Sequence, residues 1–203
     1  VLTGLGLTEI AVNAMPRVLV LTSGHEVIEP GESLTAGKIY NSNRAMICGL
    51  LEDLGFHKIT HYHVSDAPEE LESEINHVLQ LSEDADIIIS SGGVSVGLFD
   101  TMPLIYEKLG AKSIYARIQM RPGAASYGAV TPKGQIIFGL SGNPGAAFNG
   151  WHLIVAPTLK RYKGLKNWTT PVVACVMDSE IFKRNAFDRY VQGKVIFGGG
   201  APR

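Results

Sequence analysis

Short continuous apolar runs alternate along the first 165 positions with longer stretches of helical periodicity. Runs of this kind, rich in Val, Ile and Leu, predict strands that are buried on both faces. The predicted strands cover residues 17–22, 58–64, 86–90, 114–120 and 135–140. Gly134 predicts a turn between the last two of them.

Apolar residues at helical spacing follow several of these strands. Residues 41–43 offer N-caps for a helix that Gly55 ends, and residues 68–81 start with Pro and Glu, as helix N-termini often do. A short helix is expected over residues 100–109, and Pro144 suits the first turn of one long helix.

This alternation predicts a three-layer α/β/α domain with a mostly parallel sheet and right-handed crossovers. The composition changes around residues 163–167, which are polar and turn-like. Beyond them, residues 171–176 and 189–197 predict strands with no helix between. We therefore expect a linking segment over 1–16, the α/β domain over 17–165 and a short, incomplete β module over 168–203.

Charge and composition exclude some partners. The 203 residues carry a formal net charge of −1, which provides no basic field for a nucleic acid. No apolar run approaches the ~20 residues that span a bilayer, and the first residues lack signal-peptide features. Cys48 and Cys175 lie outside any CxxC pair and are expected to be reduced thiols. The expectation is a cytoplasmic protein that binds neither nucleic acid nor membrane.

Three loops rich in Gly and Ser follow predicted strands, at residues 22–26, 90–97 and 141–144. Ligands of open α/β sheets bind beyond the carboxyl ends of the strands, where these loops should meet. Glycines allow consecutive backbone N–H groups to surround an anion, and the helices that follow point their positive ends to the same place. A phosphate-bearing ligand is expected, although tight turns alone also require Gly. Walker GK[ST] and Rossmann GxGxxG motifs are lacking, which disfavours nucleotide hydrolysis and dinucleotide redox chemistry.

Acidic residues near this edge could hold a metal ion. Asp100 either caps a helix or ligates Mg²⁺ beside the anion, because Mg²⁺ takes one or two carboxylates together with phosphates and waters. Glu26 could also take part, whereas Asp66 suits a helix cap. Arg121 is either a bidentate anion contact or a solvated residue at a strand end. The six histidines show no zinc-ligand spacing.

The loops together resemble the MoeA family, whose eukaryotic relatives include the gephyrin E domain. The resemblance runs over residues 5–189 and rests on five motifs in the family's order. They are Asn41-Ser42-Asn43, the SSGGVSVG of residues 90–97, Asp100, Arg121-Pro122-Gly123 and Gly142-Asn143-Pro144. The resemblance implies a MogA-like molybdopterin-binding domain and the start of the family's C-terminal β domain, without the family's N-terminal domains.

Such proteins are transferases that insert molybdenum from molybdate into adenylylated molybdopterin with Mg²⁺, and release AMP. The resemblance implies catalytic and metal-binding roles for Asp100 and Glu26. It also implies a homodimer in the intact protein, and incomplete activity for the 203 residues alone. The implied ligand-binding residues are Ser23, Gly24, Asn43, Ser91, Gly92, Gly93, Ser95, Val96, Gly97, Arg121, Pro122, Gly123, Ser141, Gly142, Asn143 and Pro144.

Departures from the family pattern leave alternatives open. His25 stands where the family's TGDE loop has an acid, Asn41 replaces another acid, and Ala124 replaces the lysine of PGKP. Ser141 replaces the Pro of LPGNP. One alternative is a non-catalytic or divergent pterin- or nucleotide-binding scaffold, in which case Ala124→Lys and Asn41→Asp should raise turnover. Another is a nucleotide or sugar-phosphate enzyme that shares the fold.

Overall fold

A six-stranded sheet forms the centre of the molecule, in a computed structural model that describes residues 1–93, 101–178, 188–198 and 202. Its strand order is β4-β1-β5-β9-β8-β6. The strands are β1 (Val18–Ser23), β4 (Ile59–Val64), β5 (Ile87–Ser91), β6 (Lys112–Tyr115), β8 (Tyr127–Val130) and β9 (Ile136–Leu140). The predicted strands at 17–22, 58–64, 86–90 and 135–140 are confirmed to within one residue at each end.

The first four strands of this order are mutually parallel, as predicted. The other two pairs are antiparallel: β8 pairs with β9, and β6 with β8. The predicted strand over 114–120 is wrong, because β6 ends at Tyr115 and Met120–Arg121 forms a separate strand, β7. The turn at Gly134 therefore joins β9 to β8, a strand that the short YGAV pattern did not predict.

Two helices, α1 and α4, begin at side-chain caps that the sequence carries, whereas α2 and α5 begin without a side-chain cap. The Asn41 side chain accepts a hydrogen bond from the Arg44 N–H, and Asn143 accepts one from Ala146, so each caps the helix after it. The helices are α1 (Ser42–Asp53), α2 (Leu71–Ser82), α3 (Thr101–Lys108), α4 (Pro144–Gly150) and α5 (Ala156–Tyr162), with a π-helical turn (Trp151–Val155) and a 3₁₀ turn (Thr3–Leu5). Short strands β2 (Val27–Ile28), β3 (Ile39–Tyr40) and β10 (Asp188–Arg189) complete the order.

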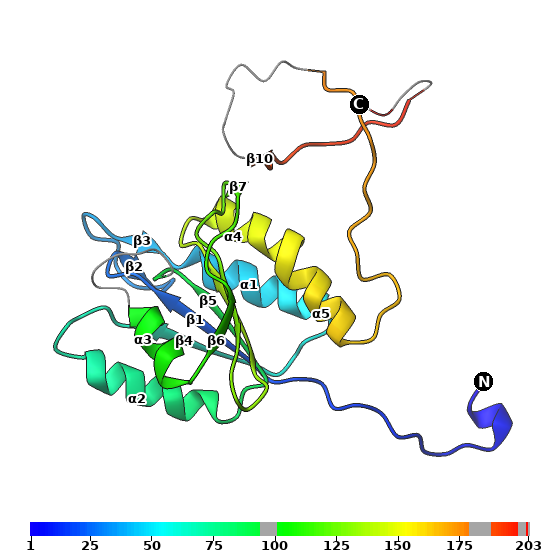
Figure 1. Cartoon of the computed structure of the whole chain (residues 1–203), viewed down its shortest axis with the longest axis horizontal. Helices are drawn as coiled ribbons and strands as arrows, with labels where there is room; N and C mark the ends of the chain where they lie inside the picture. Colours follow the sequence, from blue (N-terminus) through cyan, green and yellow to red (C-terminus); the bar gives the residue numbers. More distant parts are fainter. Residues whose placement is uncertain (94–100, 179–187, 199–201, 203) are drawn as a thin grey trace.

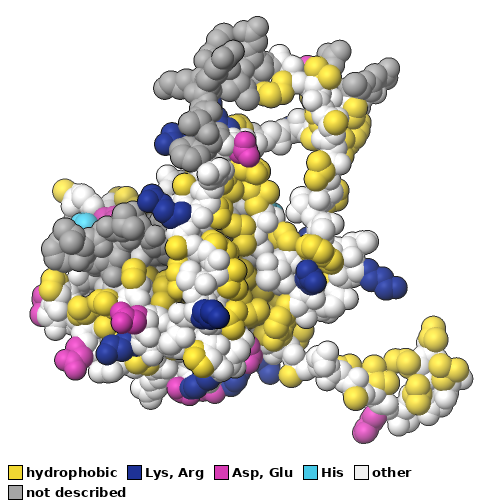
Figure 2. Space-filling model, in the orientation of Figure 1, with side chains coloured by type: hydrophobic (Ala, Val, Ile, Leu, Met, Phe, Trp, Pro, Cys, Tyr) yellow, Lys and Arg dark blue, Asp and Glu magenta, His cyan; other side chains and the backbone are white. Residues whose placement is uncertain are grey.

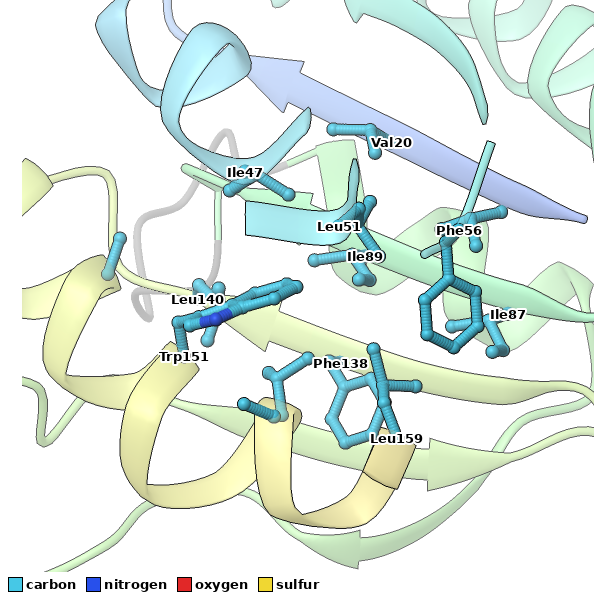
Figure 3. Packing of buried hydrophobic residues seen from close by; sticks show 14 residues of the cluster. Val20, Ile47, Leu51, Phe56, Ile87, Ile89, Phe138, Leu140, Trp151 and Leu159 are labelled. Atoms are coloured by element: carbon cyan, nitrogen blue, oxygen red, sulfur yellow. The ribbon is translucent and has the colours of Figure 1, made fainter. Parts of the chain in front are cut away.

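Two hydrophobic clusters, one on each face of the sheet, confirm the three-layer fold. Alternate residues of β1 separate between them: Val18 and Val20 in one, Leu19 and Leu21 in the other. Helices α1, α4 and α5 cover the first face, where Trp151 packs near Leu140 (Figures 1 and 3). Helices α2 and α3 cover the second.

The two strands predicted over 171–176 and 189–197 are wrong as strands. Residues 171–177 carry no strand, and β10 is a two-residue strand beside β7. An extended apolar segment forms a ladder only where another strand lies beside it, and in the described residues most of this stretch has no such neighbour. Both terminal segments extend away from the sheet (Figure 1). Among the described residues, the helices are too short or too polar to cross a membrane.

Candidate functional site

A cavity of about 280 Å³ opens at the carboxyl ends of β1, β5 and β9. These three strands are neighbours and parallel, so the loops that follow them meet at one edge, as predicted. The lining contains nine of the predicted site residues: Ser23, Gly24, Glu26, Asn43, Ser91, Gly92, Gly93, Ser141 and Gly142. Thr22, His25, Val27, Ile39, Asn41, Asp66 and Ala125 complete it.

Asn43, in the first turn of α1, joins two of the three loops. Its Nδ2 donates to Ser91 Oγ and to the Gly142 carbonyl, both at 2.8 Å. The Ser91 hydroxyl in turn donates to the Ser141 carbonyl at 3.1 Å. One buried amide therefore connects α1, the end of β5 and the loop after β9.

Glycines allow the loop after β5 to pass close to Ser23. A Cβ on Gly92 would lie 2.5 Å from the Ser23 carbonyl oxygen, and one on Gly93 would lie 2.9 Å from Ser23 Oγ. Both residues have positive φ, which side chains other than Gly rarely adopt. The Gly92 N–H, however, donates to the Leu140 carbonyl, so the predicted anion nest does not include this amide.

Two polar atoms in the cavity wall are buried without a hydrogen-bond partner in the described structure: Ser23 Oγ and Asn43 Oδ1. Ser23 is 6 % exposed and Asn43 8 % exposed. Buried polar atoms in folded proteins are nearly always paired, so these two indicate a place where a ligand or water completes the hydrogen bonding.

Two carboxylates, Glu26 and Asp66, line the same cavity. Glu26 Oε2 lies 3.4 Å from His25 Nδ1, and Asp66 Oδ1 accepts a hydrogen bond from the Thr101 hydroxyl at 3.3 Å. The described lining contains neither Lys nor Arg. Among the described residues, His, Cys, Asp and Glu form no group of three that could enclose a metal ion. A cation in this cavity would therefore need oxygen ligands from a bound molecule or water in addition to these carboxylates.

A polar network behind the cavity was not predicted from the sequence. Thr22 Oγ1 lies 3.1 Å from His61 Nε2 and 3.1 Å from His63 Nδ1, both on β4. Asn41 Nδ2 donates to the same hydroxyl at 2.9 Å and to Glu29 Oε1 at 2.8 Å. The alternation of His61 and His63 on one strand was the available signal, but which neighbour they face depends on the β1–β4 register.

The network lowers the pKa of two of its groups, His61 and Glu29. Burial, and then the nearby Arg44 charge, lower the pKa of His61 to about 4, so this ring is neutral near pH 7. Burial alone would raise the pKa of Glu29, but hydrogen bonds from Asn41 and Arg44 lower it overall. Arg44 also forms an ion pair with Glu29 at 2.5 Å.

The remaining predicted residues lie elsewhere. Asn143 caps α4 and Pro144 begins it, whereas Arg121 is exposed on β7, where its carbonyl accepts from Tyr190 N–H. In the described structure, Asn143, Pro144 and the turn over residues 121–123 are not part of the cavity lining. Asp100, Ser95, Val96 and Gly97 lie outside the described residues.

Comparisons with known proteins point to one group. A family described as "Probable molybdopterin binding domain" matches residues 19–161. The molybdopterin molybdenumtransferase of Staphylococcus aureus (strain MRSA252) is 36 % identical over 194 residues, which cover 96 % of this chain and 45 % of that protein. The same-named protein of Staphylococcus epidermidis (strain ATCC 12228) is 33 % identical over 198 residues, with the same two coverages. The chain therefore spans less than half the length of these relatives.

A solved structure has the same fold. It is the molybdopterin biosynthesis moea protein from Pyrococcus horikosii, with a TM-score of 0.64 and 28 % sequence identity. The similarity covers 80 % of this chain and 39 % of that one.

Proposed function

We propose, because this chain belongs to the molybdopterin-binding domain family, that it is the pterin-binding domain of a molybdopterin molybdenumtransferase. The resemblance inferred from its motifs is confirmed by the family match. In the proposed reaction, adenylylated molybdopterin and molybdate yield the molybdenum-bearing cofactor and AMP. The single observation that carries the proposal is the cavity where the three loops meet, with two buried oxygen atoms that have no hydrogen-bond partner among the described residues. The name of the curated relatives favours the enzyme over a non-catalytic scaffold.

The donor set in the cavity fits Mg²⁺ shared with the substrate. Glu26 and Asp66 provide carboxylates, and an anionic ligand beside them needs a cation because the described lining lacks Lys and Arg. When bound, Mg²⁺ would neutralise charge on the cleaved pyrophosphate. We extend the proposal to Asp100, which follows the loop after β5 in the sequence. The proposal does not extend to zinc, whose sites need more protein ligands.

The chain's own residues position the ligand. Asn41 and Asn43, at the N-terminus of helix α1, line the cavity, and the positive end of the helix dipole favours a ligand that carries negative charge. Val27 and Ile39 add an apolar wall on which a ring can lie. The site thus holds a ligand with both a ring and phosphates, and no side chain in it is required as a nucleophile.

We also propose the setting of this reaction: a cytoplasmic protein that forms a homodimer at full length and binds its substrates without nucleic acid or membrane. The domain boundaries proposed are 1–16, 17–165 and 168–203. The sheet and its helices, which run from Val18 to Tyr162, support the central one. We expect the 203 residues alone to bind ligand but to turn over incompletely.

The test is a calorimetric titration of this chain with molybdopterin and its adenylylated form, with and without Mg²⁺. We expect binding that prefers the adenylylated form and strengthens with Mg²⁺. Glu26→Gln should reduce the Mg²⁺ dependence, whereas Glu9→Gln, a matched change in the exposed N-terminal segment, should not. If the Staphylococcus aureus relative binds both compounds under the same conditions and this chain binds neither, the proposal is wrong.

A further inference from the structure

The orientation of the Asn43 amide is determined by its neighbours. The Gly142 carbonyl can only accept, so the atom that faces it must be Nδ2. The Ser91 hydroxyl donates its single proton to the Ser141 carbonyl. It must therefore accept the hydrogen bond that joins it to Asn43, so Nδ2 is the atom that faces it too. Both Nδ2 protons are used, and a flipped amide would place two carbonyl oxygens against each other. Oδ1 is therefore the atom left buried without a hydrogen-bond partner in the part of the chain that the structure describes.

An amide oxygen accepts hydrogen bonds and donates none, which restricts what can bind there. A phosphate dianion also carries only acceptors, so its oxygens would repel Asn43 Oδ1. A ring with an N–H group can satisfy it. The second unpaired atom, Ser23 Oγ, can donate to an oxygen or nitrogen of the same ring or accept from another of its N–H groups.

We propose that Asn43 Oδ1 and Ser23 Oγ form a subsite that recognises the amino-lactam edge of a heterocyclic ring, and that phosphate binds outside it. This inference rests on the proposed function, and it specifies that the ring edge of the ligand, and not its phosphate, contacts Asn43 and Ser23. A 2-amino-4-oxo ring presents N–H donors next to a carbonyl acceptor. The N–H donors match Asn43 Oδ1, which can only accept, and the carbonyl matches the Ser23 hydroxyl, which can donate. Adenine lacks a carbonyl on its ring, so its edge matches less well.

The loop after β5 packs closely against Ser23 and limits the sides from which the two unpaired atoms can be reached. Ser23 Oγ faces Gly93, where an added Cβ would lie 2.9 Å away. Gly142 lies against Gly92, with 3.4 Å between its added Cβ and the Gly92 Cα. These short approaches show that the loops pack against one another behind this wall, so a ligand meets the two unpaired atoms from the cavity, which Ser23 and Asn43 both line.

The Ser23→Ala variant tests the role of this hydroxyl in ligand binding separately from any role in stability. The hydroxyl makes no hydrogen bond in the described structure, so its removal should leave the melting temperature unchanged or raise it. It should weaken binding of pterin by about tenfold, since one ligand hydrogen bond is lost. The matched control is Ser82→Ala, another buried serine, whose hydroxyl donates to the Val78 carbonyl in α2. It should lower the melting temperature and leave binding unchanged.

The probes are pterin, an analogue methylated at N3 and doubly methylated at the 2-amino nitrogen, and inorganic phosphate. Each competes with molybdopterin for the 203-residue chain. We expect the methylated analogue to compete at least about tenfold less well than pterin, and phosphate to compete equally against wild type and Ser23→Ala.

Several results would overturn the subsite while leaving the proposed function intact, provided that molybdopterin binds. They are equal competition by the two rings, no competition by pterin, unchanged pterin binding in Ser23→Ala, or weaker phosphate binding in that variant. An ordered water at these atoms would give the first or third result. Failure of molybdopterin itself to bind would instead overturn the proposed function.

Discussion

At the scale of single residues, space rather than backbone conformation distinguishes the glycines of this chain. Gly92 and Gly134 both have positive φ, 90° and 83°. A Cβ on Gly134 would meet nothing within 4 Å, whereas one on Gly92 would lie 2.5 Å from the Ser23 backbone oxygen. A backbone oxygen cannot rotate away as a side chain can. Gly92 is therefore required for the contact between the ends of β1 and β5.

Gly92→Ala and Gly134→Ala form a matched pair that tests this contact. Gly134→Ala should cost about 1–2 kcal/mol, the price of a left-handed conformation for a residue with a Cβ. Gly92→Ala should cost about 3–5 kcal/mol, because steric overlap is added to the same strain. Urea unfolding at pH 7 measures both. Equal losses would show that the loop after β5 moves away from Ser23 freely.

At the scale of elements, the Thr22 hydroxyl connects β1, β4 and the start of α1. A hydroxyl donates once and accepts twice. Asn41 donates to it, so of the two imidazole nitrogens beside it one must donate and the other accept. The Asn41 side chain also caps α1 and donates to Glu29. An amide, which donates and accepts at once, suits this position in a way that a carboxylate does not.

Asn41→Asp should therefore destabilise this chain rather than restore an ancestral function. The new carboxylate would face the Glu29 carboxylate at the place of a 2.8 Å hydrogen bond, and Thr22 would lose a donor. We expect a loss of about 1–3 kcal/mol in the free energy of unfolding.

The double variant Asn41→Asp/Glu29→Gln supplies the control, because a Gln amide can donate to the new carboxylate. It should recover more than half of the loss. A stable Asn41→Asp single variant with raised molybdopterin turnover would instead support the scaffold alternative, in which lost chemistry is restored.

At the scale of the whole molecule, the core ends before the C-terminal segment begins. The buried residues of both clusters lie between Val18 and Leu159. The segment beyond carries exposed apolar side chains, among them Val172 at 95 % and Phe197 at 74 % exposure. Figure 2 shows hydrophobic side chains along both extended terminal segments. The C-terminal segment contacts the domain through hydrogen bonds from the Tyr190 N–H to the Arg121 carbonyl and from the Asn149 side chain to the Tyr190 carbonyl.

Truncation after Trp168 should leave the domain folded. We expect a loss of no more than about 2 kcal/mol, because the broken contacts are mostly exposed hydrogen bonds. Self-association of the chain should decrease, since exposed apolar side chains are removed. Calorimetry and sedimentation velocity measure the two effects. A truncated chain that unfolds at room temperature would show that the segment is part of the domain's core.

Several features followed from the sequence by itself. Apolar runs predicted β1, β4, β5 and β9, residues 41–43 marked the start of α1, and Pro144 marked the start of α4. Because parallel strands end at one edge, the three loops could be placed together, and nine predicted residues do line the cavity. The helix opened by Pro144 was predicted as one element, but it contains a π turn before Pro157, whose ring would clash with a carbonyl in a regular helix.

Other features were decided only by tertiary structure. The direction of β8, the separation of β6 from β7, and the placement of Arg121 away from the cavity depend on which strand pairs with which. The contact of Thr22 with the two histidines depends on the register between β1 and β4, and the unpaired oxygen of Asn43 depends on how α1 packs against the ends of β5 and β9. Local signals such as caps and apolar runs act within a few residues. Which side chains finally meet is determined by packing between segments distant in sequence, which local patterns do not encode.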